Sequence, residues 1–267
     1  MGLNVDNALT LDDEACIDSF DSRNGQYSVI NSGQNATVTT NSTIANKMLI
    51  NGGGCIEGDV FVGPGGDPNV VISNTSAVTG TTGDQSVEYP MPTLAEPTNV
   101  GANVGNLVYT GVSTINTNLH AQNLTIDNGG TLQIDGYITI LVENDFQVNS
   151  GSHLEIAPGG SLALYVKGQF RLDSGGHMVD PKDPRVLTVY VLGTQNAVLA
   201  SGSQMYGVMV APTARLVLES ASEFYGKFVG DGMEAVSASE FHQDVNPDVG
   251  AVVQGADSFN VRWCEQP

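Results

Sequence analysis

The stretch that decides the fold is Ser203-Gln-Met-Tyr-Gly-Val-Met-Val210, because it returns 19 residues later as Ser222-Glu-Phe-Tyr-Gly-Lys-Phe-Val229. A shorter copy follows, since Ala221-Ser-Glu-Phe-Tyr225 recurs as Ala238-Ser-Glu-Phe-His242 at an offset of 17. Each copy places a serine, a polar residue, an apolar residue and an aromatic ring in the same order. This part of the chain is therefore built from sequence repeats.

Weaker repeats precede these copies. The segment from Val142 to Leu154 aligns with Val166 to Met178 at an offset of 24, which matches Phe146 with Phe170 and His153 with His177. Tyr165-Val-Lys-Gly168 and Tyr190-Val-Leu-Gly193 differ by 25. Offsets between 17 and 25 exclude a β-propeller, whose blades need about 40 residues. They favour a β-solenoid, in which insertions change the corner lengths between short strands.

The pattern between the repeats is strand and turn. Apolar and polar residues alternate in short runs that end at Asn-Gly, Gly-Gly, Ser-Gly or Pro-Gly, and helical periodicity is scarce. The clearest runs are Leu124-Thr-Ile126, Thr131-Leu-Gln-Ile134, Tyr137-Ile-Thr-Ile140, Leu154-Glu-Ile156 and Leu216-Val-Leu218. One pass of about 20 residues cannot bury its own apolar side chains, whereas stacked passes about 4.8 Å apart can.

We therefore predict an all-β fold, a single-stranded parallel β-helix or β-solenoid, with right-handed winding as the expectation. A β-sandwich is the alternative, because it also has short alternating strands, but it gives no reason for the serine–aromatic repeat.

The predicted organisation is one domain with irregular ends. We expect residues 1–34 to form an amino-terminal cap, residues 35–245 the coils, and residues 246–267 a carboxy-terminal cap that shields an open strand edge. Residues 79–105 contain Pro90, Pro92 and Pro97 and should form a proline-rich inserted loop. Residues 180–185 form a second, shorter insertion.

Charge excludes two classes of partner. The chain has 267 residues, with 29 acidic and 9 basic side chains and a net charge of −20, and it has no Lys or Arg from residue 48 to residue 166. Nucleic acids and anionic membranes both require basic patches, so neither is an expected partner. No stretch is apolar enough for direct membrane insertion. The acidic, Asn-, Ser-, Thr- and Gly-rich composition favours a bacterial extracellular or cell-surface protein.

The start of the chain lacks a basic segment followed by an apolar one. We therefore expect any export segment to be absent from it. Cys16, Cys55 and Cys264 form no CxxC pair, and the sequence leaves their disulfide connectivity open.

The repeats also carry a resemblance to a known family. Tyr206 to Pro212, Phe224-Tyr-Gly226 and Phe241-His-Gln-Asp244 resemble the carboxy-terminal signature of a bacterial surface β-helix domain of unknown function. That domain occurs with PilX-type, pilin-like amino-terminal segments in exported proteins. Further likeness lies at Asp18 to Tyr27, Asn35 to Asn41, Ile56 to Gly63 and Tyr89 to Pro92. The resemblance implies a fold and a location, and no reaction.

Two candidate sites of different chemistry remain. Asp173, Asp180, Lys182, Asp183 and Arg185 are the nearest approach to the carboxylate and base cluster of a carbohydrate-active β-helix enzyme. Against that interpretation, proline-flanked charges are ordinary in solvated corner loops.

The other candidate is a calcium site. Asp244, Asn246 and Asp248 offer oxygen ligands at alternate positions, and calcium takes about six to eight such oxygens. His153 and His177 should stack on one face, but they lack a third ligand at metal-binding spacing. We expect no cofactor apart from this candidate calcium.

The function predicted from sequence is a non-catalytic, extracellular structural or adhesive module. Its expected partner is a surface glycan or a neighbouring protein subunit. The alternatives are a polysaccharide lyase or hydrolase and a filament subunit that self-associates end to end.

Overall fold

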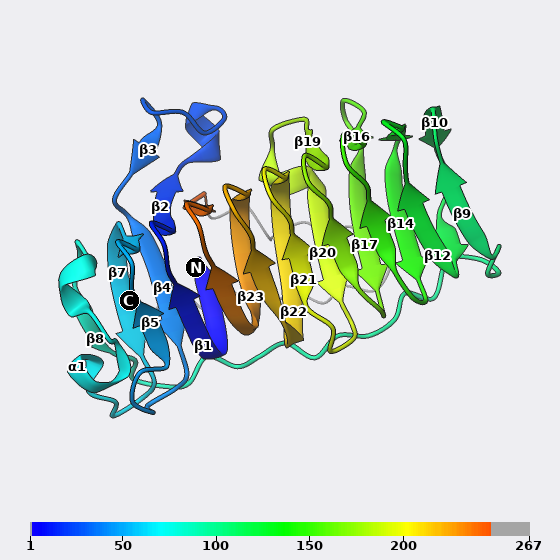
Figure 1. Ribbon diagram of the computed structural model, residues 1–267. Helices are drawn as coiled ribbons and strands as arrows, with labels where there is room; N and C mark the ends of the chain where they lie inside the picture. The colour runs from blue at the N-terminus through cyan, green and yellow to red at the C-terminus, as the bar shows by residue number, and fades with distance from the viewer. Residues whose placement is uncertain (1, 247–267) are drawn as a thin grey trace.

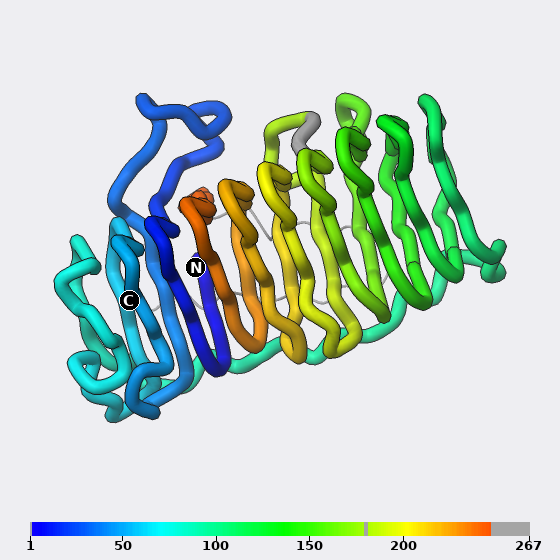
Figure 2. The backbone as a smooth tube through the Cα atoms, in the orientation of Figure 1, coloured from blue at the N-terminus to red at the C-terminus, as the bar shows by residue number. Residues whose placement is uncertain are grey.

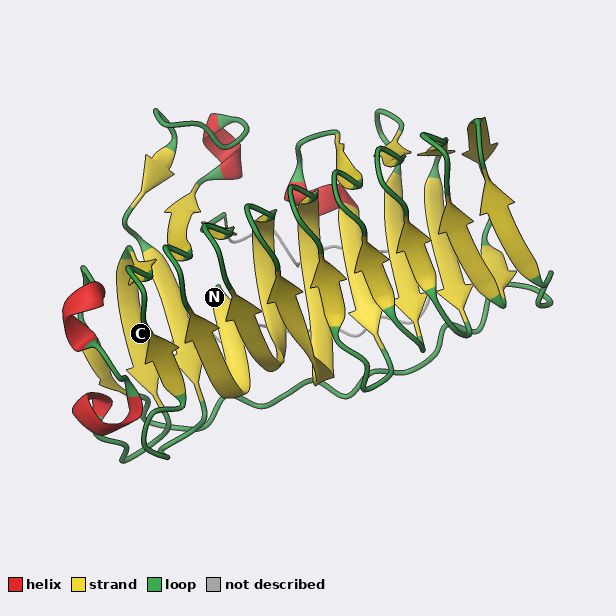
Figure 3. Ribbon diagram, viewed as in Figure 1, coloured by secondary structure: helices red, strands yellow, loops and turns green. Residues whose placement is uncertain are grey.

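The computed structural model describes residues 2–246, apart from the side chains of residues 179 and 180. Strands make up 49% of the described residues and helices 4%, which confirms the all-β prediction. In the described part the pairing is parallel, except between β2 (Cys16–Phe20) and β3 (Ser32–Gly33). Strands fill the body of the molecule, and the short helices lie at one end and in projecting loops (Figure 3). No helix among the described residues is long and apolar enough to cross a membrane.

The strands form three parallel ladders. Each pass of the chain, which we call a rung, adds one strand to each ladder in turn. In spatial order the first ladder contains β9 (Asn106–Tyr109), β12 (Asn123–Ile126), β15 (Phe146–Val148), β18 (Phe170–Leu172), β21 (Ala197–Leu199), the last parts of β22 (Gln204–Leu218), β23 (Glu223–Ala235) and β1 (Leu3–Leu11), then β5 (Met48–Ile50).

The second ladder contains β10 (Val112–Ile115), β13 (Thr131–Ile134), β16 (His153–Ile156), β19 (His177–Asp180), the first parts of β22 and β23, β24 (Glu240–Asp244), β2 and β6 (Cys55–Ile56). The third contains β11 (Leu119–Ala121), β14 (Tyr137–Val142), β17 (Ser161–Val166), β20 (Leu187–Val191), the middle parts of β22 and β23, the start of β1, β4 (Ala36–Thr40), β7 (Gly58–Val62) and β8 (Thr82–Asp84).

The ladder register confirms the sequence repeats. Tyr206 pairs with Tyr225, and Tyr225 pairs with His242. The alignments at offsets 24 and 25 are also correct, since Phe146 pairs with Phe170 and Tyr165 with Tyr190. Identical side chains stack because adjacent rungs repeat at the strand spacing. The ring centroids of Tyr165 and Tyr190, for example, lie 4.5 Å apart.

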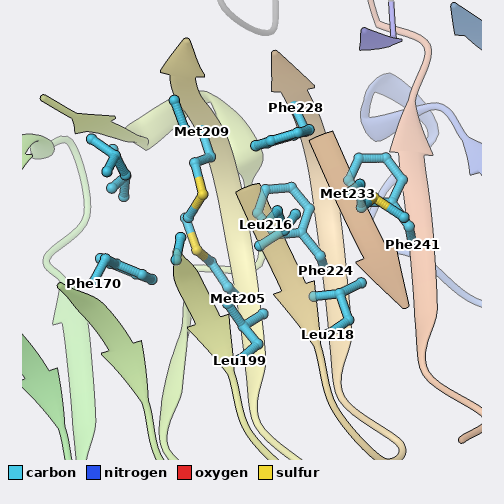
Figure 4. Close-up of a cluster of buried hydrophobic side chains, with 14 of the residues drawn as sticks. Phe170, Leu199, Met205, Met209, Leu216, Leu218, Phe224, Phe228, Met233 and Phe241 are labelled. Carbon is cyan, nitrogen blue, oxygen red and sulfur yellow. The ribbon is translucent and has the colours of Figure 1, made fainter. Parts of the chain in front are cut away.

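Apolar side chains from all three ladders form one core along the stack. The apolar residue of the serine–aromatic repeat points inward, so Met205, Phe224 and Phe241 lie in register and are fully buried. Figure 4 shows this region, where Phe228 and Met233 enter the same core from the other parts of β23. Burying each such side chain stabilises the fold by roughly 1.5–3 kcal/mol.

The glycine after the repeated tyrosine is required by backbone packing. Gly226 has a φ of 145°, and a Cβ built on it would lie 1.8 Å from the carbonyl oxygen of Gly207 in the neighbouring rung. At this point β22 and β23 pass from the second ladder to the third without a loop. The Tyr-Gly dipeptide of the repeat therefore marks a sharp corner.

The amino-terminal segment lies inside the stack and is not an end cap. β1 pairs with β23 on one side and with β4 and β5 on the other, while β2 pairs with both β24 and β6. The prediction that residues 1–34 cap an open end is therefore wrong. The start of the chain, coloured blue, continues the stack where the orange end of the described chain leaves it (Figure 2). We call this junction of β24, β2 and the start of β1 the seam. The predicted carboxy-terminal cap, apart from Asn246, lies outside the described residues.

The proline-rich insertion returns the chain from one end of the stack to the other. β8 pairs with β7, so the insertion begins later than residue 79. Residues 86–105, which we call the strap, then run along the outside of the rungs to β9 (Figure 1). The strap is held by reciprocal hydrogen bonds between the Asn41 amide and the Tyr89 backbone, both 2.8 Å, and by the ion pair of Glu96 with Lys167 at 2.9 Å.

The remaining short elements lie at corners. α1 (Pro68–Val71) and η2 (Thr75–Ala77) form part of the rung beyond β7, η1 (Ser22–Asn24) lies in the loop after β2, and η3 (Pro184–Val186) occupies the second insertion predicted from sequence. Cys16 and Cys55 are directly in register in β2 and β6 and form a disulfide, which decides the connectivity that the sequence left open. Cys264 lies outside the described residues.

Candidate functional site

The predicted calcium ligands lie at the seam. Asp244 is fully buried, and its Oδ1 accepts hydrogen bonds from the backbone N–H of Ser22 at 3.1 Å and of Asn246 at 3.0 Å. The Asn246 side-chain amide donates to Ser22 Oγ, and the backbone carbonyl oxygen of Asn246 accepts from Lys227 Nζ at 2.8 Å. Asp244 and Asn246 thus hold the start of the 21–34 loop. Asp248 lies outside the described residues, so the calcium set stays a prediction.

The candidate carbohydrate-enzyme residues divide between two corners. Asp173 precedes β19 and pairs with Arg171, while Gln147 donates to its other oxygen at 2.8 Å. Asp183 follows β19, pairs with Arg185 at 2.7 Å and caps η3. Burial acts to raise the pKa of Asp183, but the hydrogen bonds and charge of Arg185 together outweigh it and hold that pKa below its usual range. Lys182 is exposed, and Asp180 ends β19. Each described carboxylate is therefore engaged locally, and the structure does not bring the two corners together.

The stacked histidines are confirmed. His153 and His177 have ring centroids 5.3 Å apart and planes 17° apart. Among the described residues, however, the cluster of three metal-binding side chains lies elsewhere, at Glu223, Glu240 and His242.

An aromatic cluster covers the seam on its outer face. Tyr206, Tyr225 and His242 stack in register, with centroids 4.1 Å and 4.5 Å apart. Tyr27, from the 21–34 loop, lies against His242 at 3.8 Å and against Tyr225 at 5.4 Å. Phe20 meets Tyr27 edge to face at 5.8 Å. The loop is therefore fixed on the ladder by ring packing.

His242 is the buried polar centre of this cluster. Its side chain is 2% exposed, its Nδ1 lies 2.6 Å from Asp18 Oδ1, and its Nε2 lies 3.1 Å from Glu240 Oε2. Tyr27 donates its hydroxyl hydrogen to the other Asp18 oxygen at 2.7 Å. Burial alone would lower the pKa of His242, but the two carboxylates outweigh it and raise that pKa above its ordinary value. The contact between His242 and Glu240 also lowers the pKa of Glu240.

Glu223 completes the acidic side of the cluster. It accepts a hydrogen bond from the Tyr225 hydroxyl at 2.6 Å and another from the Gln204 amide. Burial, then the bond to Glu223, raises the pKa of Tyr225, so the phenol stays a donor at neutral pH. One ligand atom each from Glu223, Glu240 and His242 lies within 4.8 Å of the others. This is the arrangement among the described residues best suited to hold a cation.

A shallow groove opens beneath the neighbouring 21–34 loop. It has a volume of about 260 Å³ and is mainly polar, with lining residues Ser19, Phe20, Asp21, Asn24, Ile30, Asn31, Ser32, Gly33, Asn35 and Val245. The loop is anchored by Asn31, whose amide donates to the carbonyl oxygens of Asp21, Gly25 and Gln26. Val29 and Ile30 at its tip are 91% and 98% exposed. A fixed loop thus presents two apolar side chains beside polar ones.

Comparison with protein families shows which family the chain resembles. Residues 92–248, more than half of the chain, match the family described as Domain of unknown function (DUF7305). The chain belongs to this family. No curated protein and no solved structure matches the chain. The matched region contains Glu223, Tyr225, Glu240 and His242, whereas Asp18 and Tyr27 lie before it, so the family domain and the amino-terminal segment build the seam cluster together.

Sequence reasoning missed this cluster. The signal was present in part, since the offset of 17 that aligns Tyr225 with His242 also aligns Glu223 with Glu240. Asp18 and Tyr27 gave no such signal, because they reach His242 only through the pairing of β2 with β24.

Proposed function

We propose that the protein is a non-catalytic structural and adhesive module of a bacterial exported or cell-surface assembly, pilus-associated as the family resemblance implies. We also propose that its stack is a right-handed parallel β-helix. The long parallel ladders support the structural role, because stacked rungs give a rod whose core runs its full length. The Cys16–Cys55 disulfide supports an oxidising compartment, where such bonds persist.

The observation that carries the adhesive role is the groove under the 21–34 loop. Its side-chain amides, hydroxyls and carboxylate suit the hydroxyl groups of a sugar, and Ile30 offers an apolar edge for a sugar face. The loop is already anchored in the free protein, so binding costs little ordering entropy. We propose a surface glycan as the ligand.

A glycan array with the full chain tests this proposal. We expect binding to a defined set of glycans, reduced ten-fold or more by Ile30→Ala or Asn24→Ala. Ile44→Ala is the matched control, since Ile44 is also exposed, at 61%, and is absent from the groove lining. Equal binding by the Ile30 and Ile44 variants would refute the groove as the site. Incubation with the bound polysaccharides, followed by chromatography, tests the non-catalytic role. Detection of cleavage products from any of them would refute it.

End-to-end self-association is a second candidate, supported by the rung at residues 106–115. Among the described residues β9 pairs only with β12, and β10 only with β13, and Val108 and Val112 are exposed at 60% and 84%. An unpaired apolar strand edge is a template for another chain. Sedimentation velocity should then show concentration-dependent oligomers that Val112→Lys abolishes, and a monomer at every concentration would exclude this role.

A further inference from the structure

The geometry points to a divalent transition-metal site at the seam, with Glu223, Glu240 and His242 as ligands and Zn²⁺ as the ion that fits them. The site is independent of the proposed glycan groove.

The ladder register brings the three ligands together. Glu223 and Glu240 are direct neighbours in β23 and β24, and Tyr225 and His242 are the next pair on the same face. Residues i and i+2 of a strand share a face, and adjacent strands lie about 4.8 Å apart. The ligand atoms accordingly lie within 4.8 Å of one another.

His242 is oriented toward the two glutamates. Asp18 binds its Nδ1 at 2.6 Å, so Nε2 is the nitrogen that faces the carboxylates. Nε2 is buried and lies 3.1 Å from Glu240 Oε2, with which it forms an ion pair when the ring is protonated. In the neutral ring with its proton on Nδ1, the Nε2 lone pair faces this carboxylate, an unfavourable arrangement that either a second proton or a metal cation between the two groups relieves.

Two of the three inner ligands, His242 and Glu223, also have outer partners, as metal ligands usually do. Asp18 holds the far nitrogen of His242, and Tyr27 in turn donates to Asp18. Tyr225 and Gln204 donate to Glu223. A carboxylate on the second ring nitrogen fixes the histidine tautomer and makes the ligating nitrogen more basic.

The donor set selects the metal. Imidazole nitrogen suits zinc and its neighbours, whereas calcium and magnesium prefer oxygen alone. A tetrahedral zinc with bonds of about 2.0–2.1 Å separates its ligand atoms by about 3.3 Å. His242 Nε2 and Glu240 Oε2 already lie 3.1 Å apart, so only the wider separations in the cluster, up to 4.8 Å, must close by about 1 Å. Glu240 can shift within the cluster, because its side chain is 46% exposed. Its exposure leaves the fourth position to water or to another ligand.

A zinc ion here would couple the family domain to the amino-terminal segment. The three ligands lie within residues 92–248, but Asp18, which orients His242, precedes them. Asp18→Asn should therefore weaken zinc binding about 10- to 100-fold, the range typical of outer-partner losses.

Calorimetric titration of the metal-stripped full chain with zinc chloride tests the proposal. We expect one zinc per chain, with affinity ten-fold or more lower in Glu240→Gln and in Glu223→Gln, both confirmed as folded by circular dichroism. His153→Gln and Cys264→Ser are the controls and should bind as the unmodified chain does, because a stacked histidine and a cysteine outside the disulfide are groups that can attract zinc elsewhere.

Three outcomes of the titration would overturn the site: no binding at millimolar zinc, unchanged affinity in both glutamate variants, or loss of binding in a control variant. Nitrogen NMR supplies an independent readout. If His242 keeps a proton on both ring nitrogens in the zinc-saturated protein, an imidazolium between Asp18 and Glu240 is the complete description of the cluster and the metal is excluded.

Discussion

The placement of β1 inside the stack makes Leu9→Ala a decisive substitution. Leu9 is fully buried, and its in-register neighbours are Met233 of β23 and Met48 of β5. Leu-to-Ala changes in a packed core cost about 3–5 kcal/mol, and less where the cavity can collapse. Both neighbours are methionines, which adapt to irregular space. We therefore expect a loss of roughly 2–4 kcal/mol in the free energy of unfolding, or about 6–12 °C in Tm.

Hydrogen exchange measured by mass spectrometry shows which strands lose protection in Leu9→Ala. Since β1 is paired on both sides, exchange should rise in β23 as well as in β5. Leu132→Ala is the matched control, because Leu132 is equally buried but lies in β13, away from the seam. It should lower Tm similarly while raising exchange first in β10 and β16. Unchanged protection of β23 in Leu9→Ala, with loss confined to the amino-terminal rungs, would refute the seam.

Three further predictions concern the disulfide, the corner glycine and the strap. Replacing Cys16 and Cys55 together by Ser should lower stability by roughly 4 kcal/mol, because the bond spans 39 residues; thermal melts that match those of the unmodified chain would contradict this. Gly226→Ala should prevent folding or lower Tm by more than 10 °C, since its Cβ meets a backbone carbonyl, and a normal melt would show that the corner can open. Lys167→Ala should raise exchange in the strap while costing less than about 1 kcal/mol globally, because exposed ion pairs contribute little. Lys167, then His120, lowers the pKa of Glu143, so the stability that the Lys167–Glu143 pair contributes is present above the unfolded-state pKa and lost as pH falls through the lower folded value. An unfolding free energy with the same dependence on pH below about pH 4 in Lys167→Ala as in the unmodified chain would refute this linkage.

The seam itself was beyond sequence reasoning for a physical reason. β1 and β23 lie more than 200 residues apart and share no repeat, and their association depends on backbone hydrogen bonds that any parallel edge can offer. The choice of partner comes from the fit of Leu3, Leu9 and Leu11 to the open rung. Complementarity of that kind has no local pattern, so the natural inference from an atypical first segment was an end cap.

Sequence alone determined the strand class and the register of neighbouring rungs, because each repeat encodes contacts with the pass directly before or after it. Tyr225 over His242 and Phe146 beside Phe170 could be read as alignments for that reason. Tertiary structure decided the order of the rungs in space, the course of the strap, and the meeting of Asp18 and Tyr27 with His242. These features arise between segments that are distant along the chain, where packing and electrostatics act on groups that no periodic pattern relates.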